Sequence, residues 1–315
     1  MKSIYIANLQ PKMELLNEPF LLHEVAERTT KDGRSFLLFT LRDKTGTISG
    51  VFWDVPPLVL EWARPGQVVL VTGRINLYKE ALQLSATDLN PLQTDNLSEF
   101  VPVSRRSQNE MVAELRQLID RLAEPWQSLA RHLLLAEAFL PRFASAPAAR
   151  NMHHAVLGGL LEHTLSMANL CDYLADHYPY ANRDLLIAGA LLHDMGKVAE
   201  YDLDNSFAFT EDGRLVGHIV RAVTLIEKGA AELGDFPPDD LRYLIHLVLS
   251  HHGNLEWGSP VVPKTLEAVL LHQVDMLDSR VQGFLEHAET DSDSAGWTIK
   301  PSPMFRTELK RPSAM

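Results

Sequence analysis

The feature that most constrains the fold is a change in hydrophobic period about one third of the way along the 315-residue chain. Between residues 19 and 92, apolar residues tend to alternate with polar ones in short runs, which is typical of β-strands. From about residue 110, apolar residues recur at three- and four-residue spacing, which is typical of amphipathic helices. We therefore predict a multidomain protein in which an all-β domain is followed by an all-α domain.

The β part contains five strand-like segments separated by turn signals such as KDG and KTG. A stretch with Pro56, Pro57 and Trp62, helical at most, divides the third segment from the fourth. This order fits a small Greek-key barrel of the OB type, although a small β-sandwich would produce a similar pattern. The five segments are 21–30, 34–43, 47–54, 67–78 and 81–89.

Changes in composition suggest the domain boundaries. We predict an OB-like nucleic-acid-binding domain over 1–95, a linker and helical lead-in over 96–150, and a helical domain over 151–290. Residues 291–315 show no periodicity and are predicted to be a flexible tail. The stretch PRFASAPAARNMHH reads as a break between helices. The predicted helices are 110–123, 126–140, 155–178, 183–195, 218–233, 239–251 and 263–287.

Composition excludes several classes of protein. With 46% hydrophobic and 22% charged residues, the chain resembles an ordinary soluble protein. No apolar run reaches the roughly 18 residues of a membrane span, and the N-terminus lacks the pattern of a secretory signal, so no membrane association is expected. Cys171 is the only cysteine, which excludes disulfides and thiolate metal sites and makes the cytoplasm the expected location.

The net charge of −12 argues against a protein that coats duplex DNA through a basic face. The excess of negative charge lies in residues 151–315, which hold 24 acidic and 12 basic residues. An enzyme of nucleic acids remains compatible with this charge, because bound divalent cations can supply the positive charge where phosphate docks.

Histidines and aspartates interrupt apolar helix faces at five places in the helical part. A carboxylate that faces a core costs several kcal/mol unless it is paired or bound to a metal. Polar residues on the apolar faces of several helices are explained most simply if they converge on one site. The five places are GGLLEHT with His163, LLHDMGK with His193 and Asp194, GHI with His218, SHHG with His251 and His252, and LHQVD with His272 and Asp275.

Imidazoles and carboxylates without thiolates suit divalent ions of intermediate hardness. We expect two such ions and favour Mn²⁺, with Fe²⁺, Co²⁺, Ni²⁺, Zn²⁺ or, less readily, Mg²⁺ as alternatives. Two ions can together activate a water molecule and hold phosphate oxygens, which suits phosphodiester hydrolysis.

These five motifs resemble those of the HD-domain superfamily of metal-dependent phosphohydrolases. Together with the OB-like barrel, the stretches PAARNMHHAVLGGLLEHT and SHHGNLEWGSPVVPKTLEAVLLHQVDMLD resemble a narrower group, the YhaM-type 3′-to-5′ exoribonucleases. The resemblance covers roughly residues 15–290. It implies an HD domain over 151–290.

The resemblance also implies roles for individual residues. Asp194 would bridge two ions, and Lys197 would face phosphate and assist catalysis. His252 would bind metal or substrate. The implied core ligands are His163, His193, Asp194 and Asp275, and the additional ligands are His218 and His251.

Other polar residues keep two interpretations each. His154 either lines the substrate cleft or serves the structure. His272 is either a partner of a ligand or a core residue, and Asp278 is a solvated or salt-bridged residue. Elsewhere the barrel carries aromatic residues that either stack bases or fill its core, and a few basic residues near its turns. These are Phe36, Phe39, Phe52, Trp53 and Tyr78, and Arg34, Arg42, Lys44, Arg74 and Lys79.

The expected function is metal-dependent 3′-to-5′ hydrolysis of single-stranded RNA, with single-stranded DNA as another possible substrate, to nucleoside 5′-monophosphates. Two alternatives share the same motifs. One is a phosphohydrolase of small nucleotides such as dNTPs, cyclic nucleotides or dinucleotides. The other is a nucleic-acid-binding regulator whose HD part is only structural. The sequence leaves the oligomeric state open.

Overall fold

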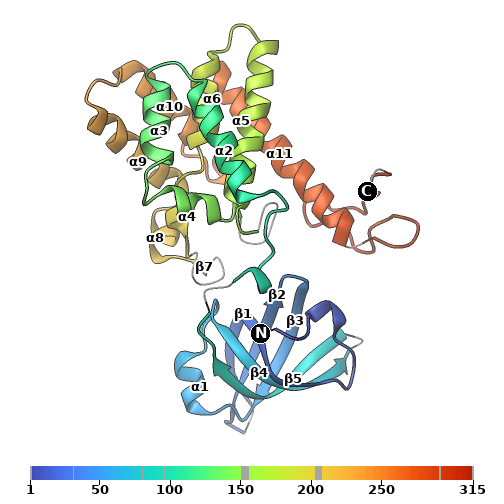
Figure 1. Cartoon of the computed structure of the whole chain (residues 1–315). Helices are drawn as coiled ribbons and strands as arrows, with labels where there is room; N and C mark the ends of the chain where they lie inside the picture. The colour runs from blue at the N-terminus through green and yellow to red at the C-terminus, as the bar shows by residue number, and fades with distance from the viewer. Residues whose placement is uncertain are drawn as a thin grey trace. The chain divides into compact units, whose positions relative to one another are not determined.

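The computed structural model describes residues 2–30, 32–79, 81–94, 97–149, 156–202, 208–290 and 292–313. The chain forms two compact units. One comprises Met1–Val103 and Asp202–Ala208, and the other comprises Ser104–Tyr201 and Phe209–Met315. The first unit contains a five-stranded barrel and the second contains the long helices (Figure 1).

The first unit is a closed barrel with the strand order β1-β2-β3-β5-β4, in which β4 also pairs with β1. The β3–β5 pair is parallel and the other pairs are antiparallel. Closure identifies an OB-type barrel and excludes the sandwich. The elements are β1 (Glu14–Thr29), β2 (Ser35–Asp43), β3 (Gly46–Trp53), α1 (Pro57–Trp62), β4 (Val68–Tyr78) and β5 (Ala81–Pro91).

Strand β1 begins at Glu14, seven residues before the predicted segment 21–30. Its first half pairs with β4 and its second half pairs with β2, so this one strand closes the barrel. The register shifts between Leu15 and Glu18, where Asn17 has a φ of 50°. This irregularity breaks the two-residue alternation, which is why the pattern alone did not reveal the first half of the strand.

Strand alternation separates the aromatic residues of the barrel. Phe39 and Phe52 lie in the apolar core, whereas Trp53 is 54% exposed and Tyr78 is 56% exposed. The absence of a side chain at Gly50 makes room for the Phe39 ring, which lies 2.2 Å from the position of an added Cβ. Two of the five aromatic residues therefore fill the core of the barrel, and the other three remain candidates for stacking on bases.

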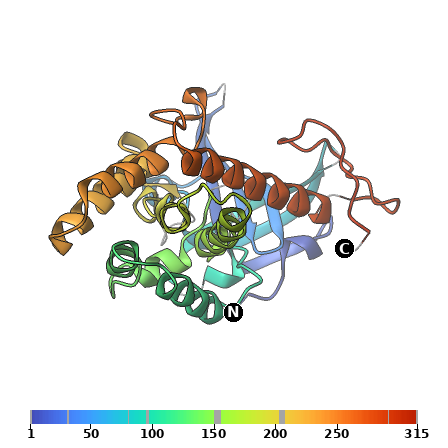
Figure 2. The ribbon, with the colours of Figure 1, turned by 90° about the horizontal axis from the view of Figure 1, so that it is seen from above.

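The second unit is built around α6, whose residues from Leu185 to Leu192 are all buried. Helices α3, α5, α10 and α11 pack against it (Figure 2). Among the described residues, no helix combines the length and the apolar character that a membrane span requires. The helices are α2 (Gln108–Asp120), α3 (Trp126–Leu134), α4 (Leu140–Ser145), α5 (Gly159–His177), α6 (Arg183–Leu192), α7 (Lys197–Glu200), α8 (Glu211–Leu215), α9 (His218–Leu233), α10 (Pro238–Ser250) and α11 (Leu266–Thr290).

The prediction of one helix over 126–140 is wrong. Helix α3 ends at Leu134, and α4 begins at Leu140 and continues into the stretch that we predicted to be a break. Pro141 explains the difference, because a proline ring clashes with the carbonyl four residues earlier but is well tolerated in the first turn of a helix.

The segments on either side of the predicted HD domain have defined structure. Helices α2 and α4 pack against α5, so the helical lead-in belongs to the second unit. After α11, the described residues 292–313 contain two isolated bridges, Ser292 with Thr298 and Trp297 with Lys310, and bury Leu309. The flexibility of this tail stays a prediction.

Candidate metal centre

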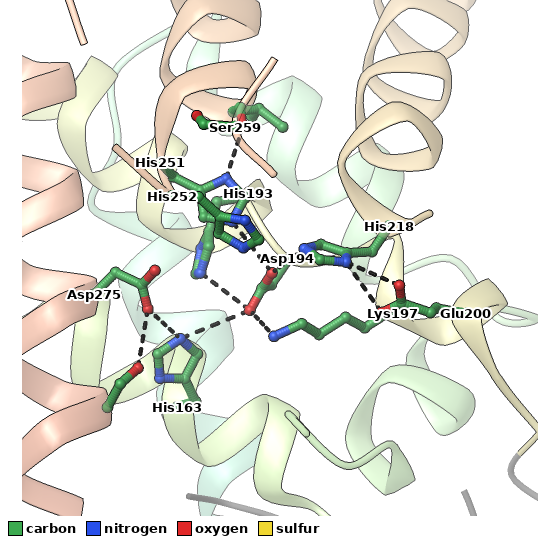
Figure 3. A network of polar contacts seen from close by, with 12 residues as sticks. His163, His193, Asp194, Lys197, Glu200, His218, His251, His252, Ser259 and Asp275 are labelled. Carbon is green, nitrogen blue, oxygen red and sulfur yellow. Dashed lines mark hydrogen bonds and ion pairs between the residues drawn. The ribbon is translucent and has the colours of Figure 1, made fainter. Parts of the chain in front are cut away.

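The second unit brings the predicted histidines and aspartates of five separate helices into one cluster, the His/Asp cluster. Their side chains point toward one another around Asp194 (Figure 3). The cluster comprises His163 of α5, His193 at the C-cap of α6, Asp194 directly after it, His218 as the first residue of α9, His251 at the C-cap of α10, His252 directly after that, and Asp275 of α11.

Asp194 lies at the centre of the cluster and is only 3% exposed. Its Oδ2 is 3.3 Å from Nε2 of His193 and 3.8 Å from Nε2 of His163. Its Oδ1 is 3.5 Å from Nε2 of His218 and 3.7 Å from Nε2 of His251. The two carboxylate oxygens thus face two different pairs of imidazoles.

Three overlapping sets of three residues each offer ligand atoms that lie within 4.8 Å of one another. One set includes Asp275, whose Oδ1 is 3.4 Å from Nε2 of His163. Three or four nitrogen and oxygen donors at this spacing match the needs of a divalent ion. The sets are His163, His193 and Asp275; His193, Asp194 and His251; and His218, His251 and His252.

Main-chain carbonyls fix the protonation of three imidazoles. A carbonyl oxygen can only accept, so the Nδ1 that faces it carries the proton and donates. The neutral ring then presents the lone pair of Nε2 to the centre of the cluster. The Nδ1 bonds are His193 to Ala190 at 2.9 Å, His251 to Val248 at 2.7 Å and His252 to Trp257 at 2.9 Å.

Carboxylates hold the other two imidazoles. Nδ1 of His163 donates to Oδ2 of Asp278 at 2.7 Å, and Ser166 Oγ donates to the other oxygen of Asp278. Nδ1 of His218 lies 3.1 and 3.0 Å from the two carboxylate oxygens of Glu200. All five histidines therefore use Nδ1 for a protein partner and direct Nε2 inward.

Four buried atoms of the cluster have no hydrogen-bond partner within the described part of the chain. They are Nε2 of His193, His218 and His251, and Oδ1 of Asp194. A buried polar atom without a partner costs about 1–3 kcal/mol, so four in one place would be expensive. Divalent cations bound at the cluster would satisfy these atoms, because each atom offers a lone pair. The residues present therefore fit a metal ion.

Gly196 lets α9 approach the cluster. A Cβ at this position would lie 2.0 Å from the carbonyl oxygen of His218 and 2.8 Å from the backbone nitrogen of Ala222. Any side chain here would push away the start of α9 and would move His218 from Asp194.

His272 fixes the turn that carries two of the histidines. Its Nδ1 lies 2.8 Å from the carbonyl oxygen of His251, and its ring fills the space where a Cβ of Gly253 would lie. Gly253 has a φ of 79°, which a glycine adopts without strain. Of the two interpretations for His272, the structure supports that of a partner to a cluster residue.

Comparison with known families and proteins agrees with this geometry. The HD domain family matches residues 160–280, and an OB-fold nucleic acid binding domain family matches residues 24–92. The 3′-5′ exoribonuclease YhaM of Bacillus velezensis is 36% identical over 272 residues, which cover 85% of this chain and 86% of the relative. The protein of the same name from Bacillus licheniformis is 37% identical and covers 83% of this chain and 88% of its own length. The chain belongs to the YhaM family.

Membership of the YhaM family confirms the resemblance that the five motifs indicated. An HD domain implies dependence on a divalent metal, and the His/Asp cluster could hold one. Among solved structures, the second OB-fold domain of replication protein A from Methanococcus maripaludis matches 30% of this chain and 97% of its own, at 21% identity and a TM-score of 0.24. That score adds nothing to the assignment.

The charges in the cluster shift the pKa values of its members. Burial opposes the charged form of His163, but hydrogen bonds to Asp275 and Asp278 outweigh it and raise the pKa of His163 to about 9. Burial also disfavours the charged form of Asp194, yet Lys197 and the neighbouring imidazoles hold the pKa of that carboxyl well below its usual range. The carboxylates beside His163 therefore favour its charged form.

His251 and His252 differ from His163. Burial lowers the pKa of His251 well below its usual range, and nearby His193 adds to this effect. The pKa of His252 is lowered too, chiefly by burial and then by His218. Both rings are therefore neutral near pH 7, which is the form that binds metal.

Lys197 lies closer to Asp194 than the resemblance alone implied. Its Nζ donates to Oδ2 of Asp194 at 2.6 Å, and its side chain is 13% exposed. Burial opposes the charge, but Asp194 outweighs it and raises the pKa of Lys197. The ammonium is therefore charged at the edge of the cluster.

Two carboxylates at the cluster were not predicted from the sequence as partners of histidines. Asp278 was expected to be solvated or salt-bridged, and it binds His163. Glu200 was not singled out, since nothing in KVAEY marks its contact with His218. Glu200 does not lie at a helical spacing from Asp194, so no periodic pattern connects the two residues. Asp278, in contrast, could have been found from its place one turn after Asp275 in a helix.

The remaining histidines either lie outside the cluster or are not among the described residues. His154, which we predicted to bind substrate, lies outside the described residues, so this prediction is untested. Five further histidines of the described residues belong to none of the three sets of ligand atoms. They are His23, His132, His177, His246 and His287.

The barrel carries a stacked aromatic pair on its outer surface. Trp53 and Phe36 have ring centroids 4.5 Å apart at an interplanar angle of 29°. Nearby, Arg34 forms ion pairs with Asp32 and Asp54. The exposed ring of Trp53, held by its stacking on Phe36, offers a face on which a nucleic-acid base can stack.

Proposed function

We propose that the protein hydrolyses single-stranded RNA from its 3′ end and releases nucleoside 5′-monophosphates, using two divalent metal ions, with Mn²⁺ as the favoured ion. The observation that carries the proposal is the set of four buried atoms without hydrogen-bond partners around Asp194, in a chain of the YhaM family. The relatives are named 3′-5′ exoribonucleases, which supports the RNA substrate and the direction.

The two oxygens of Asp194 divide the proposed metal site into two halves. The Oδ2 half would use His163, His193 and Asp275, and the Oδ1 half would use His218, His251 and His252. Asp194 would be shared by both halves. When bound, divalent ions polarise phosphate oxygens and supply an activated water for hydrolysis.

The remaining chemistry falls to the chain's own side chains. Asp194 keeps a full negative charge at the centre because the ammonium of Lys197 holds its pKa low. Lys197 brings a positive charge to the partly exposed edge of the cluster, where a phosphate oxygen would need it. The Nδ1 bonds hold the imidazole rings, so Nε2 atoms keep their direction when substrate arrives.

The barrel supplies a candidate surface for the RNA strand. Trp53 is 54% exposed and stacks on Phe36, and Tyr78 is 56% exposed with Nζ of Lys79 5.4 Å from its ring centroid. Exposed rings bind bases of any sequence, which suits an enzyme that degrades many RNAs. A domain that matches an OB-fold nucleic acid binding family supports this role.

The test is a time course with single-stranded RNA and DNA labelled at the 3′ or 5′ end, in the presence of Mn²⁺, with products resolved at single nucleotides. We expect mononucleotides to appear at once from 3′-labelled RNA and a shrinking ladder from 5′-labelled RNA. Asp194→Asn should lower the rate on the order of 10³-fold or more. Asp235→Asn, at an exposed carboxylate outside the cluster, is the matched control.

Two results would overturn the proposal. One is a purified, folded Asp194→Asn variant as active as the wild type. The other is a wild-type protein that leaves RNA intact with every divalent ion tried and cleaves small nucleotides instead. The second result would favour the small-nucleotide phosphohydrolase, which needs the same ligands. A location in the cytoplasm, expected because Cys171 is the only cysteine, remains part of the proposal.

A further inference from the structure

The five inward-facing imidazoles have two kinds of Nδ1 partner. Three bind main-chain carbonyls, and only His163 and His218 bind carboxylates among the described residues. The difference matters because a carboxylate makes an imidazole a stronger electron donor than a carbonyl does. Asp278 and Glu200 are therefore the two residues through which the protein can tune the cluster.

Asp278 is held by both of its oxygens. Oδ2 accepts from His163, and Oδ1 accepts from Ser166, which lies one helical turn after His163 in α5. The side chain of Asp278 is 10% exposed. With both oxygens occupied, the carboxylate can hold the His163 ring in one orientation.

Glu200 is held by the segment around it. It is buried, with 8% exposure, and Gly213 packs so closely that a Cβ there would lie 2.4 Å from the Glu200 carbonyl oxygen. Thr210 donates its side-chain hydroxyl to Ala199 and its backbone N–H to Glu200. The carboxylate thus faces His218 from a tightly packed turn (Figure 3).

The two carboxylates act on opposite halves of the cluster. His163, backed by Asp278, faces Oδ2 of Asp194, whereas His218, backed by Glu200, faces Oδ1. Each half therefore contains one imidazole with a carboxylate behind it and at least one with a carbonyl behind it.

We propose that Asp278 and Glu200 are positioning residues, each of which sets the metal affinity of one half of the cluster, Asp278 through His163 and Glu200 through His218. The inference rests on the proposed metal-dependent function. Replacing such a partner of a metal-binding histidine lowers metal affinity about 10- to 100-fold in known sites. We expect that loss in one half only, with the other half unchanged.

The experiment is a titration of the metal-free full-length protein with Mn²⁺ by calorimetry and with Co²⁺ by absorption spectroscopy. Wild type should bind two ions. Asp278→Asn should weaken one ion about 10- to 100-fold, and Glu200→Gln should weaken the other by a similar factor. Asp235→Asn and Glu211→Gln change exposed carboxylates of the same unit and should leave both affinities unchanged.

A double-mutant comparison assigns each carboxylate to its half. His218→Ala should abolish one site, and adding Glu200→Gln should change nothing further at the remaining site, because the two residues act through one bond. His163→Ala with Asp278→Asn should behave in the same way. Combining Glu200→Gln with His163→Ala should instead weaken both sites.

Milder variants keep the inference testable if Asp278→Asn or Glu200→Gln fails to fold. Ser166→Ala removes only the second bond of Asp278 and should weaken the same ion by a smaller factor. Glu200→Asp keeps the charge and shortens the reach, and it too should weaken only the ion near His218. Melting temperatures of the metal-free variants check folding, since a purely structural role would lower these without selecting one ion.

Two results would overturn the inference and leave the proposed function intact. Wild type could bind two ions while the carboxylate variants bind both with unchanged affinity, or each variant could weaken both ions equally. A wild type that binds no divalent ion would instead overturn the proposed function itself. The two failures are therefore distinguishable.

Discussion

The two units of the molecule bury carboxylates in opposite ways. In the barrel unit, Asp43 is 1% exposed and fully partnered: Oδ1 accepts from the N–H and hydroxyl of Thr45, and Oδ2 accepts from the N–H of Ile6 and lies 3.3 Å from Nζ of Lys2. In the helical unit, Asp194 is 3% exposed, but its Oδ1 has no hydrogen-bond partner among the described residues.

This difference separates burial for stability from burial for function. The bonds of Asp43 fasten the N-terminal segment to the barrel, and each charge-assisted bond contributes about 1.5–3 kcal/mol. Oδ2 of Asp194 accepts from Lys197, but Oδ1 and the neighbouring Nε2 atoms gain little from folding alone, because their lone pairs face one another. Buried polar atoms that have no partner in the folded protein indicate a binding site, in this case for a metal ion.

The largest expected effect is stabilisation of the helical unit by metal. At a free ion concentration 100 times the dissociation constant, binding adds about 2.7 kcal/mol to the free energy of unfolding. The melting temperature should rise by about 5–10 °C in the presence of Mn²⁺ and return on chelation. Differential scanning calorimetry measures this. A melting temperature that does not change with Mn²⁺ would contradict the comparison, because burial of Asp194 would then not serve metal binding.

The second prediction exchanges the two carboxylates for amides. Asp43→Asn should lower the free energy of unfolding of the metal-free protein by about 2 kcal/mol, since it loses charge-assisted bonds. Asp194→Asn should also destabilise the metal-free protein, because it removes the charge that pairs with the ammonium of Lys197. Only Asp194→Asn should abolish the added stability that Mn²⁺ gives. Denaturant titration compares both. Stabilisation of Asp194→Asn by Mn²⁺ to the same extent as wild type would contradict the distinction.

The third prediction concerns pH. Because the pKa of His163 is raised to about 9, this ring carries a proton below pH 9 that a metal ion must displace. Through this group, metal affinity should fall about tenfold, or 1.4 kcal/mol, for each pH unit below 9. His251 adds nothing in this range, because its pKa is lowered. Titrations of Mn²⁺ between pH 6.5 and 9 test this, and an affinity independent of pH would contradict it.

The same proton has the opposite effect on the metal-free protein. A raised pKa means that the charged form of His163 stabilises the folded state at pH 6.5 and below, and that this contribution is lost as the pH rises through 9. The metal-free protein should therefore become less stable toward pH 9 while metal binding becomes stronger.

The smallest expected effect lies on the barrel. Trp53→Ala removes one exposed ring, and one stacked base contributes at least about 1 kcal/mol, so KM for RNA should rise about fivefold. The turnover number on a dinucleotide should not change. Leu58→Ala, at a side chain that is 68% exposed, is the matched control. An unchanged KM for long RNA would contradict the role of Trp53 in binding RNA.

Periodicity and motif spacing predicted the barrel, the helical unit and the convergence of the five His/Asp motifs. They missed the first half of β1, because the irregularity at Asn17 interrupts alternation, and the end of α3, because Pro141 acts at a distance of four residues. Such features depend on single residues rather than on a repeating pattern.

The position of Asp278 one turn after Asp275 could have marked it as a candidate, but its pairing with His163, and the pairing of Glu200 with His218, could not be predicted from the sequence. Asp278 and Glu200 contact His163 and His218 across 115 and 18 residues of chain, and only packed helices bring them together. The ligand roles of the cluster residues stay predictions, because geometry brings donors together without identifying what they bind.

The most direct measurement is a crystal structure of the protein grown with Mn²⁺, with an anomalous difference map collected near the manganese absorption edge. The account predicts two strong peaks, one on each side of Asp194, each within ligand distance of one of its oxygens and of the facing Nε2 atoms. A map without a peak at Asp194, from crystals that hold Mn²⁺ elsewhere or none at all, would contradict the account.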